Sequence, residues 1–557
     1  MSDAPASATE TPKPASITVE GRTCEFDPDA RPSLLQVALE AGVEIPHYCY
    51  HPGMSVVASC RICLAEVSQP NPRNNGALEL IPKLVPTCQT PAVDGAVVHL
   101  QSPKTVANQK AVMEYLLINH PLDCPVCDQA GECSLQDYSY RYGNSSSRFQ
   151  EDKIKQPKKD LGAVLLYSDR CIMCSRCVRF TKEVTGTNEI GIFGRGSEEQ
   201  IDVFPGKPLD NPLAGNVVDI CPVGALLDKD FLMSMRVWNL TKTPSIDGIT
   251  ASGDNLSVET NDGKVYRIKP RTNLDVNQWW TSDEIRYGWK HVQSPDRLTT
   301  PMVKRHGTHE AVDFNTAYDT LLEKLEVTKL KKGPGSLAVV VSPMLSCEEA
   351  SLLGQLAKKL DPQAVLAVGP VPIDGEDQTF PGGYTVRAEK APNARGVRRA
   401  LEQVADHVLA FDQLDLSSVH AVVLTGNYPE GWITDDFEAA LSGKFVALLD
   451  TLPNALVDAG TGGADVVLPG ATWLEKAGTF ENADGRLQTF EAAIPVREGT
   501  KSEGQLATDL LARLEGHRPG KFDAAATREA LGGVFITDVH HPTEQDVPLS
   551  EVEFVAL

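Results

Sequence analysis

Cysteines are concentrated in the first part of the sequence. Twelve of the thirteen lie at or before Cys221, and only Cys347 follows. Cysteines that serve packing would be scattered, whereas metal ligands occur at short spacings. We therefore interpret most of these cysteines as metal ligands, in a chain kept in a reducing compartment.

The first predicted ligand group consists of Cys49, Cys60, Cys63 and Cys88. The segment before it has the pattern of two strands joined at Glu20-Gly21, followed by a helix from about Ser33 to Gly42. Two strands, a helix and then a cysteine loop is the layout of a plant-type ferredoxin, which predicts a 2Fe-2S cluster. The C-x10-C-x2-C spacing differs from the plant motif, so the match is to the architecture. A zinc site of four thiolates is the alternative.

The second predicted group consists of His120, Cys124, Cys127 and Cys133. Three closely spaced thiols need a fourth ligand, and His120 is the only good nitrogen donor nearby. A neutral imidazole in place of a thiolate makes a 4Fe-4S cluster less negative and should raise its potential. On spacing alone the group also fits a zinc site, and His120 beside Pro121 also fits an ordinary helix-end residue.

The third predicted group consists of Cys171, Cys174, Cys177 and Cys221. C-x2-C-x2-C with a distant Cys-Pro is the signature of bacterial ferredoxins and predicts a 4Fe-4S cluster. The cysteine loop also carries Arg170, Arg176 and Arg179. These arginines either stabilise the reduced, more anionic cluster or form a solvated basic face.

Two cysteines have no partner at ligand spacing. Cys24 lies inside a predicted strand, and Cys347 begins a predicted helix. We expect both to be buried or incidental thiols.

The order of these groups resembles the large iron–sulfur subunit of respiratory complex I, the NADH-quinone oxidoreductase. The resemblance is carried by the phrases IPHYCYHP, SCRICLAEV, NHPLDCPVCDQAGEC, RCIMCSRCVRF and ICPVGALLDK. It implies one 2Fe-2S and two 4Fe-4S clusters on the twelve ligands named above. It also implies an electron relay from an NADH- and FMN-binding partner subunit toward quinone, within the peripheral arm of the complex.

Some members of this family carry a further tetranuclear cluster, held by four cysteines, just after this region. The corresponding stretch here, KTPSIDGITASGDNLSVETNDG, has no cysteine. A site without thiolates cannot hold that cluster, so we expect no fourth cluster.

The second half of the chain has a different pattern. A hairpin is predicted around Asn261-Asp262-Gly263. Apolar strands then alternate with amphipathic helices, which predicts a parallel α/β sheet covered on both faces. The strands are expected at 336–343, 364–369, 420–427 and 445–453, and the helices at 347–360, 395–408 and 435–443.

The segment 464–488 resembles an element of molybdopterin oxidoreductases, to which the second half of this family is related. Cys347 lacks a supporting His–Arg pair nearby. We therefore expect a degenerate, non-catalytic domain without molybdenum or pterin, in which Glu475 and Arg486 make structural contacts.

The overall fold class expected is α+β and α/β multidomain. A disordered tail (1–15) precedes a plant-ferredoxin-like β-grasp domain (16–100), the one-His, three-Cys segment (101–155), a bacterial-ferredoxin-like domain (156–240) and the molybdopterin-oxidoreductase-like α/β domain (241–557). We expect no catalytic residue of the chain's own.

Composition excludes several function classes. The formal net charge of -23 disfavours nucleic acid and direct membrane-surface binding. No apolar run approaches the roughly 20 residues that cross a bilayer. No dinucleotide-binding fingerprint is present, so NADH and flavin should bind a partner. We expect a peripheral protein on the cytoplasmic face of the bacterial inner membrane, held through partner subunits.

Three other classes of protein share some of these features. An iron-only hydrogenase would need four more cysteines after Cys221, and only Cys347 is there. The large subunit of an NAD-linked molybdenum enzyme of the formate dehydrogenase type, and a zinc-bound scaffold without a redox role, remain as alternatives.

Overall fold

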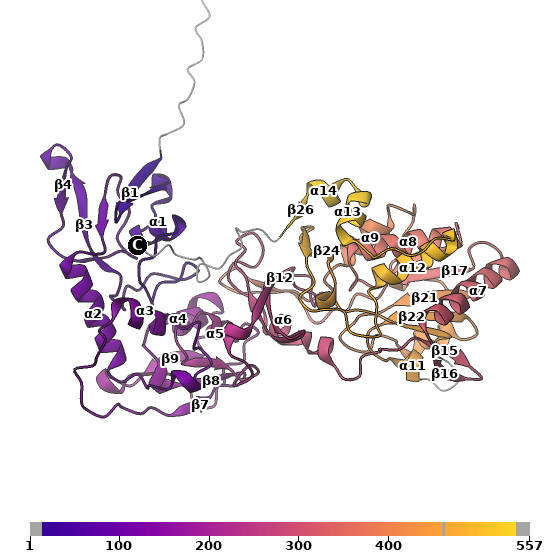
Figure 1. Ribbon diagram of the computed structural model, residues 1–557, viewed down its shortest axis with the longest axis horizontal. Helices are drawn as coiled ribbons and strands as arrows, with labels where there is room; N and C mark the ends of the chain where they lie inside the picture. The colour runs from indigo at the N-terminus through magenta and orange to yellow at the C-terminus, as the bar shows by residue number, and fades with distance from the viewer. Residues whose placement is uncertain (1–13, 459–462, 542–557) are drawn as a thin grey trace, which may run out of the picture. The chain divides into compact units, whose positions relative to one another are not determined.

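The computed structural model describes residues 14–458 and 463–541, so residues 1–13 of the predicted tail lie outside the described residues. The chain forms two compact units, drawn with labelled elements in Figure 1. The first contains the described residues up to Asn211 together with Val217–Trp238. The second contains Pro212–Asn216 and the described residues from Asn239 onward. The division into five segments stays a prediction.

The first unit begins with a mixed, six-stranded sheet of order β2-β1-β6-β3-β4, in which β5 also pairs with β3. Its strands are β1 (Ala15–Val19), β2 (Arg22–Phe26), β3 (Leu64–Asn71), β4 (Ala77–Leu80), β5 (Val85–Pro86) and β6 (Val97–His99). The predicted β1–β2 hairpin is confirmed, and its turn at Glu20 and Gly21 has positive φ at both residues. Helix α1 (Leu34–Glu40) is confirmed as well, and Ser33 begins it with a capping box.

The rest of the first unit consists of short elements that frame the other cysteine loops. Its helices are α2 (Pro103–Leu117), α3 (Ser134–Tyr142), α4 (Arg176–Arg179) and a π-helical turn (Phe180–Val184). Its strands are β7 (Lys158–Asp160), β8 (Val164–Tyr167), β9 (Ile190–Phe193), β10 (Gln200–Val203) and β11 (Leu226–Asp228). Strands β11, β8 and β7 form one sheet, and β10 and β9 form a hairpin. Helix α5 (Asn216–Asp219) precedes Cys221.

The second unit begins with a three-stranded antiparallel sheet of β12 (Thr241–Ile246), β13 (Asn255–Asn261) and β14 (Lys264–Pro270). The predicted hairpin is confirmed, because β13 and β14 join at Asp262 and Gly263, which both have positive φ. Helix α6 (Asp283–Gly288) follows.

A seven-stranded sheet of order β16-β15-β23-β22-β21-β17-β18 forms the centre of the second unit. The five strands from β23 to β18 are parallel; the alternating pattern predicted four of them, and β23 was not predicted. They are β17 (Leu337–Val341), β18 (Val365–Val368), β21 (Ala421–Thr425), β22 (Phe445–Asp450) and β23 (Val466–Pro469). The antiparallel edge of β15 (Met302–Arg305) and β16 (Thr308–Ala311) was not predicted.

Both faces of this sheet are buried. In β17 the side chains of Leu337, Val339 and Val341 pack into one apolar core, and Ala338 and Val340 pack into another. The covering helices are α7 (Phe314–Lys332), α8 (Cys347–Leu360), α9 (Ala394–Leu401), α10 (Asp435–Leu441), α11 (Ala455–Asp458) and α12 (Glu503–Glu515). Helix α9 is shorter than the predicted 395–408. The backbone N–H groups of Gln403 and Val404 donate to carbonyl oxygens three residues back, a tighter turn that ends the α-helix.

The remaining elements of the second unit are peripheral to the central sheet. They are β19 (Gln378–Thr379), β20 (Thr385–Val386), β24 (Gly478–Glu481), β25 (Leu487–Phe490), α13 (Ala524–Leu531), α14 (Val534–Thr537) and β26 (Val539–His540). None of the helices in the described residues has the length and apolar character needed to cross a membrane. The chain is thus a mixed α/β protein of several domains.

Candidate metal centres

The first predicted ligand group comes together beside the sheet of the first unit. It consists of Cys49, Cys60, Cys63 and Cys88. Strands β3 and β5 are antiparallel with Leu64 opposite Pro86, which leaves Cys63 and Cys88 at the same end of the pair. The Sγ atoms of Cys63 and Cys88 lie 3.5 Å apart. Hydrogen bonds from Cys60 and Cys88 lower the pKa of the Cys49 thiol, so the four sulfurs share one site.

The loop that carries Cys60 has an unusual backbone. It passes through the left-handed region at Ala58 (φ 49°) and at Arg61 (φ 62°). Such backbone persists in residues other than glycine only where the surroundings hold it. Here Asn108 of α2 donates its Nδ2 to the carbonyl oxygen of Arg61 over 3.0 Å. The loop is therefore held in a shape that turns its thiols toward one point.

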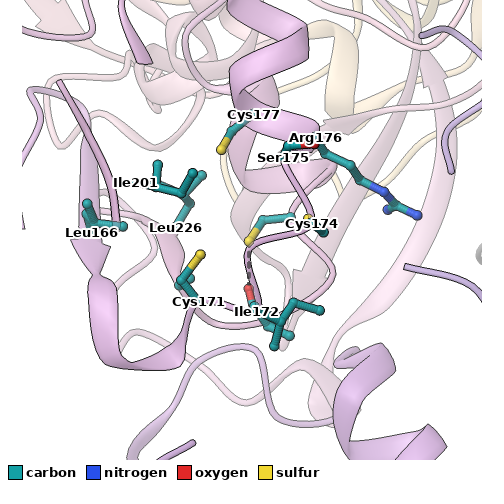
Figure 2. A pocket seen from close by; sticks show the side chains of 12 residues that line it. Leu166, Cys171, Ile172, Cys174, Ser175, Arg176, Cys177, Ile201 and Leu226 are labelled. Carbon is teal, nitrogen blue, oxygen red and sulfur yellow. Dashed lines mark hydrogen bonds between the residues drawn. The ribbon is translucent and has the colours of Figure 1, made fainter. Parts of the chain in front are cut away.

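The third group lines one cavity, as Figure 2 shows for three of its cysteines. The four thiols are those of Cys171, Cys174, Cys177 and Cys221. The backbone N–H of Met173 donates to the Cys171 Sγ over 3.4 Å, and the Cys221 thiol donates to the carbonyl oxygen of Val223 over 3.0 Å. The rest of the lining is mainly apolar, with Leu166, Ile201 and Leu226 among it. An apolar lining of this kind excludes water from a redox centre.

Burial keeps these thiols protonated in the free protein. It raises the pKa of Cys171 to about 12 and that of Cys221 to about 11. Metal binding needs the thiolate, so a metal centre that forms here must displace protons.

The second group lies on the loop between α2 and α3. His120 is half-buried, and its Nδ1 has no hydrogen-bond partner among the described residues. Burial lowers its pKa, so the imidazole is neutral with a lone pair available. Cys133 caps the start of α3, and burial raises the pKa of its thiol to about 12. A buried polar atom without a partner is costly in a native protein unless a ligand satisfies it.

Gly224 makes room beside the second group. A Cβ atom at this position would lie 2.2 Å from the Sγ of Cys127 and 3.1 Å from the Cβ of Gln129. Sequence reasoning missed this residue, although it lies in the same CPVG segment as Cys221. A glycine three residues after a ligand cysteine was the available signal.

Arg170 connects the loops of the second and third groups. Its side chain is 2% exposed, which rules out the alternative of a solvated basic face for this residue. Its guanidinium donates to Asp123 Oδ2 over 2.5 Å and to the carbonyl oxygen of Gly224 over 3.3 Å, and it lies 4.0 Å from the ring centroid of Tyr167. The charge of Arg170 opposes the rise in pKa that burial causes at Cys127. This arginine therefore acts electrostatically on the second group.

The residues present fit iron–sulfur clusters, whose ligands surround an inorganic core. Four thiols around an apolar cavity suit the third group, and the unsatisfied His120 Nδ1 with the space at Gly224 suits the second. Over residues 14–458 and 463–541 no three His, Cys, Asp or Glu side chains converge on the position of a single metal ion.

Replacing Gly224 with alanine should prevent assembly of the His120 centre, because the new Cβ overlaps the Cys127 sulfur. The iron content should fall from about ten to about six atoms per chain. Gly431 is the matched control, since a Cβ there meets nothing within 4 Å and neither glycine has a positive φ. Iron analysis of both purified variants gives the result. An undiminished iron content in the Gly224→Ala protein would contradict this account of the site.

The stretch without cysteines after Cys221 folds around buried carboxylates. Asp247 accepts hydrogen bonds from the Thr250 hydroxyl (2.5 Å) and the Ser252 hydroxyl (3.0 Å). Asp254 accepts one from the hydroxyl of Tyr384 over 2.6 Å. Burial raises the pKa of Asp247 to about 7 and that of Asp254 to about 6. The hydrogen-bonding capacity of these two buried carboxylates is thus met by neighbouring hydroxyl groups.

The two cysteines without ligand spacing are buried as expected. Cys24 lies within β2, and Cys347 begins α8. The predicted structural roles of Glu475 and Arg486 also agree with their contacts. Glu475 accepts from Arg297 over 2.9 Å in a buried ion pair, and Arg486 contacts Asp275 over 3.4 Å at the surface.

A buried ionic cluster in the second unit was not predicted. The Nζ of Lys476 lies 2.9 Å from Glu349 Oε2 and 2.8 Å from Glu503 Oε2, and all three side chains are at most 2% exposed. The second carboxylate oxygen of Glu503 accepts from Asn427 over 2.9 Å. These residues tie α8 and α12 to the loop before β24.

Five family models match the chain. They are "2Fe-2S iron-sulfur cluster binding domain" (13–103), "NADH-ubiquinone oxidoreductase-G iron-sulfur binding region" (109–148), "NADH-quinone oxidoreductase subunit 3, ferredoxin-like domain" (162–227), "NADH-ubiquinone oxidoreductase NDSU1/NuoG-like, 4Fe-4S domain" (240–290) and "Molybdopterin oxidoreductase" (297–394 and 415–513). The match over 240–290 contains no cysteine, although its description names a 4Fe-4S domain.

Named relatives come from mitochondria and from bacteria. The mitochondrial NADH-ubiquinone oxidoreductase 78 kDa subunit of Candida albicans is 38% identical over 77% of this chain and 56% of that protein. An NADH-quinone oxidoreductase subunit of Rickettsia felis is 35% identical over 62% of this chain and 49% of that protein. A chain in the crystal structure of an NAD+-reducing [NiFe]-hydrogenase matches with 29% identity and a TM-score of 0.34, over 40% of this chain and 91% of that one. The chain spans about half the length of the curated relatives it matches.

Proposed function

We propose that this chain is an electron-relay subunit in the peripheral arm of NADH-quinone oxidoreductase. The chain belongs to the family of large iron–sulfur subunits of that complex. In this role it receives electrons from an NADH- and FMN-binding partner subunit and passes them toward quinone. The observation that carries the proposal is the meeting of Cys171, Cys174 and Cys177 with the distant Cys221 around one apolar cavity. This arrangement is what a ferredoxin-type centre requires.

The proposed ligands are the twelve residues of the three groups. The 2Fe-2S cluster is assigned to Cys49, Cys60, Cys63 and Cys88. The two 4Fe-4S clusters are assigned to His120, Cys124, Cys127 and Cys133, and to Cys171, Cys174, Cys177 and Cys221. A cluster bound to these ligands would supply a site for one-electron transfer. The chain's own work is to hold the ligands, exclude water with apolar side chains such as Leu166 and Ile201, and adjust the local charge.

A fourth cluster is not part of the proposal. Between Thr241 and Lys290 the chain offers hydroxyl and carboxylate oxygens but no thiol, and Asp247 and Asp254 are already satisfied by hydroxyl donors. Iron–sulfur clusters take thiolate ligands, with histidine as an occasional substitute.

We assign the second half of the chain a scaffold role without molybdenum or pterin. Open α/β sheets bind their ligands outside the carboxyl ends of the strands. Here the chain's own groups satisfy the carboxylate in that position: Asp450, at the end of β22, accepts from the Asn427 backbone N–H over 2.8 Å and from the Trp432 Nε1 over 3.0 Å. Both Asn427 and Tyr428 are buried beside it.

The proposed partners are the NADH- and FMN-binding subunit, other peripheral-arm subunits and, indirectly, the membrane arm. We place the chain on the cytoplasmic face of the bacterial inner membrane, held there by those partners. The net charge of -23 supports attachment through proteins instead of direct contact with anionic lipid.

Metal analysis tests this proposal against the alternative of an NAD-linked molybdenum enzyme of the formate dehydrogenase type. The protein, purified anaerobically in its complex, should contain about ten irons per chain with matching sulfide, and no stoichiometric zinc or molybdenum. Stoichiometric molybdenum would support the alternative. Zinc in place of about four irons would mean that the His120 group is a zinc site.

A further inference from the structure

Arg176 contacts two cysteine loops at once. It begins α4, between Cys174 and Cys177. Its Nη2 donates to the carbonyl oxygen of Tyr50 over 2.6 Å, and its Nη1 donates to the carbonyl oxygen of Ile220 over 3.1 Å. Tyr50 directly follows Cys49, and Ile220 directly precedes Cys221. The guanidinium therefore joins the loop of the first group to both segments of the third.

Arg179, at the end of α4, also contacts the loop of the first group. Its guanidinium donates to the carbonyl oxygens of Cys49 and Ser55, the latter over 2.5 Å. Glu183 also holds this loop, but it carries a negative charge. Its carboxylate accepts hydrogen bonds from the backbone N–H of Ser55 over 2.8 Å and from the Ser55 hydroxyl over 2.6 Å. Two positive side chains and one negative side chain thus bind the Cys49 loop to the α4 segment.

The positive charges of these arginines are not neutralised by ion pairs. Within the described residues neither Arg176 nor Arg179 forms a salt bridge, although the charge of Glu183 acts on Arg179, and the Nε of Arg176 is buried without a hydrogen-bond partner. Burial raises the pKa of the Cys174 thiol, and both arginines act in the opposite direction. The Cys49 sulfur in turn raises the pKa of Arg179 against a larger effect of burial. Both charges therefore act on Cys174 of the third group, and Arg179 also interacts with Cys49, whereas Arg176 reaches the first group through the carbonyl oxygen of Tyr50.

We propose that Arg176 and Arg179 are positioning residues that set the reduction potentials of the first and third centres together and fix the Cys49 loop against α4. The inference rests on the proposed function, since it concerns the clusters assigned to these ligands. Reduction adds one negative charge to a cluster, so an unpaired positive charge beside it stabilises the reduced form and raises the potential. Because Arg170 acts on the His120 group instead, that centre serves as an internal reference.

The test is a potentiometric titration followed by low-temperature EPR, on the full chain in its complex. In the Arg176→Met variant both the binuclear centre and the Cys171 centre should become harder to reduce, with a smaller change at the His120 centre. The Arg176→Lys variant keeps the charge and should keep both potentials close to the original values, while the loss of the two-sided contact lowers the melting temperature.

Glu183→Gln is the matched control, because it alters another contact to the Cys49 loop, at Ser55, and removes a negative charge instead of a positive one. The electrostatic account requires the potential of the binuclear centre to rise in this variant and to fall in Arg176→Met, whereas simple loosening of the loop would move it in one direction. Shifts in the same direction, or unchanged potentials in Arg176→Met, would overturn the inference. If that variant does not fold, Arg179→Met replaces it, and unchanged potentials in Arg179→Met overturn the inference. Absence of cluster signals in the unaltered protein would instead refute the proposed function.

Discussion

Replacing Cys221 with alanine should remove one 4Fe-4S cluster and lower the iron content from about ten to about six atoms per chain. Its thiol is the only ligand of the third group that does not come from the Cys171–Cys177 loop, and it completes the lining of that cavity. A three-thiol site holds a cubane poorly, so the cluster should be lost during purification. The relay from NADH to quinone should stop as well, because the proposed route passes through this centre.

Cys347→Ala is the control for this variant, since the Cys347 thiol is also buried but lies at the start of α8 beside Asn393. It should retain about ten irons. Iron and sulfide analysis together with EPR distinguishes the two. A Cys221→Ala protein that keeps all its iron, or a Cys347→Ala protein that loses as much, would contradict the assignment of Cys221.

Replacing Lys476 with methionine should destabilise the second unit by about 3–5 kcal/mol. The change leaves Glu349 and Glu503 buried with no cation between them. Burial works against the charge of Lys476, but the two carboxylates outweigh it and raise its pKa above the ordinary value. Removing one member of a buried set of charges costs more stability than the intact set contributed, because the remaining charges stay buried without a partner.

Lys359→Met is the matched control, because Lys359 pairs with Glu515 at the surface, where both side chains are about 40% exposed. Exposed pairs contribute little to stability, so this variant should unfold almost as the original protein does. Thermal and urea unfolding of the two variants measures the difference. Equal stability of Lys476→Met and Lys359→Met would contradict the claim that Lys476 stabilises the two buried carboxylates.

Local patterns were sufficient to predict much of the fold. The β1–β2 turn, the start of α1 at Ser33 and the β13–β14 hairpin follow from residues close in sequence, because glycine, asparagine and capping serine act on their immediate neighbours. The parallel strands of the second unit also follow, since both their faces are apolar.

The ligand groups were predicted from spacing, but the features that shape them were not. Cys63 and Cys88 are brought together by the pairing of β3 with β5, a strand of two residues that has no sequence pattern of its own. The close approach of Gly224 to Cys127 depends on how segments distant in sequence pack. A sequence shows that a glycine is present without showing what lies against it.

The charged residues were the least predictable part. Arg170 and Arg179 sit among cysteines in a pattern that fits both a solvated face and a buried contact, and only packing distinguishes these. Glu349 is similar, because an acidic residue in the first turn of α8 needs no partner beyond the helix N-terminus. Its ion pair with Lys476 joins residues far apart in the chain.

The central claim is that this chain relays electrons from NADH through three clusters. The most direct test mixes the anaerobically purified complex with NADH, freezes it rapidly and records low-temperature EPR spectra. The account predicts signals from one binuclear and two tetranuclear centres, all appearing on reduction by NADH and disappearing when quinone is added. Centres that contain iron but are not reduced by NADH, or fewer than three cluster signals, would contradict it.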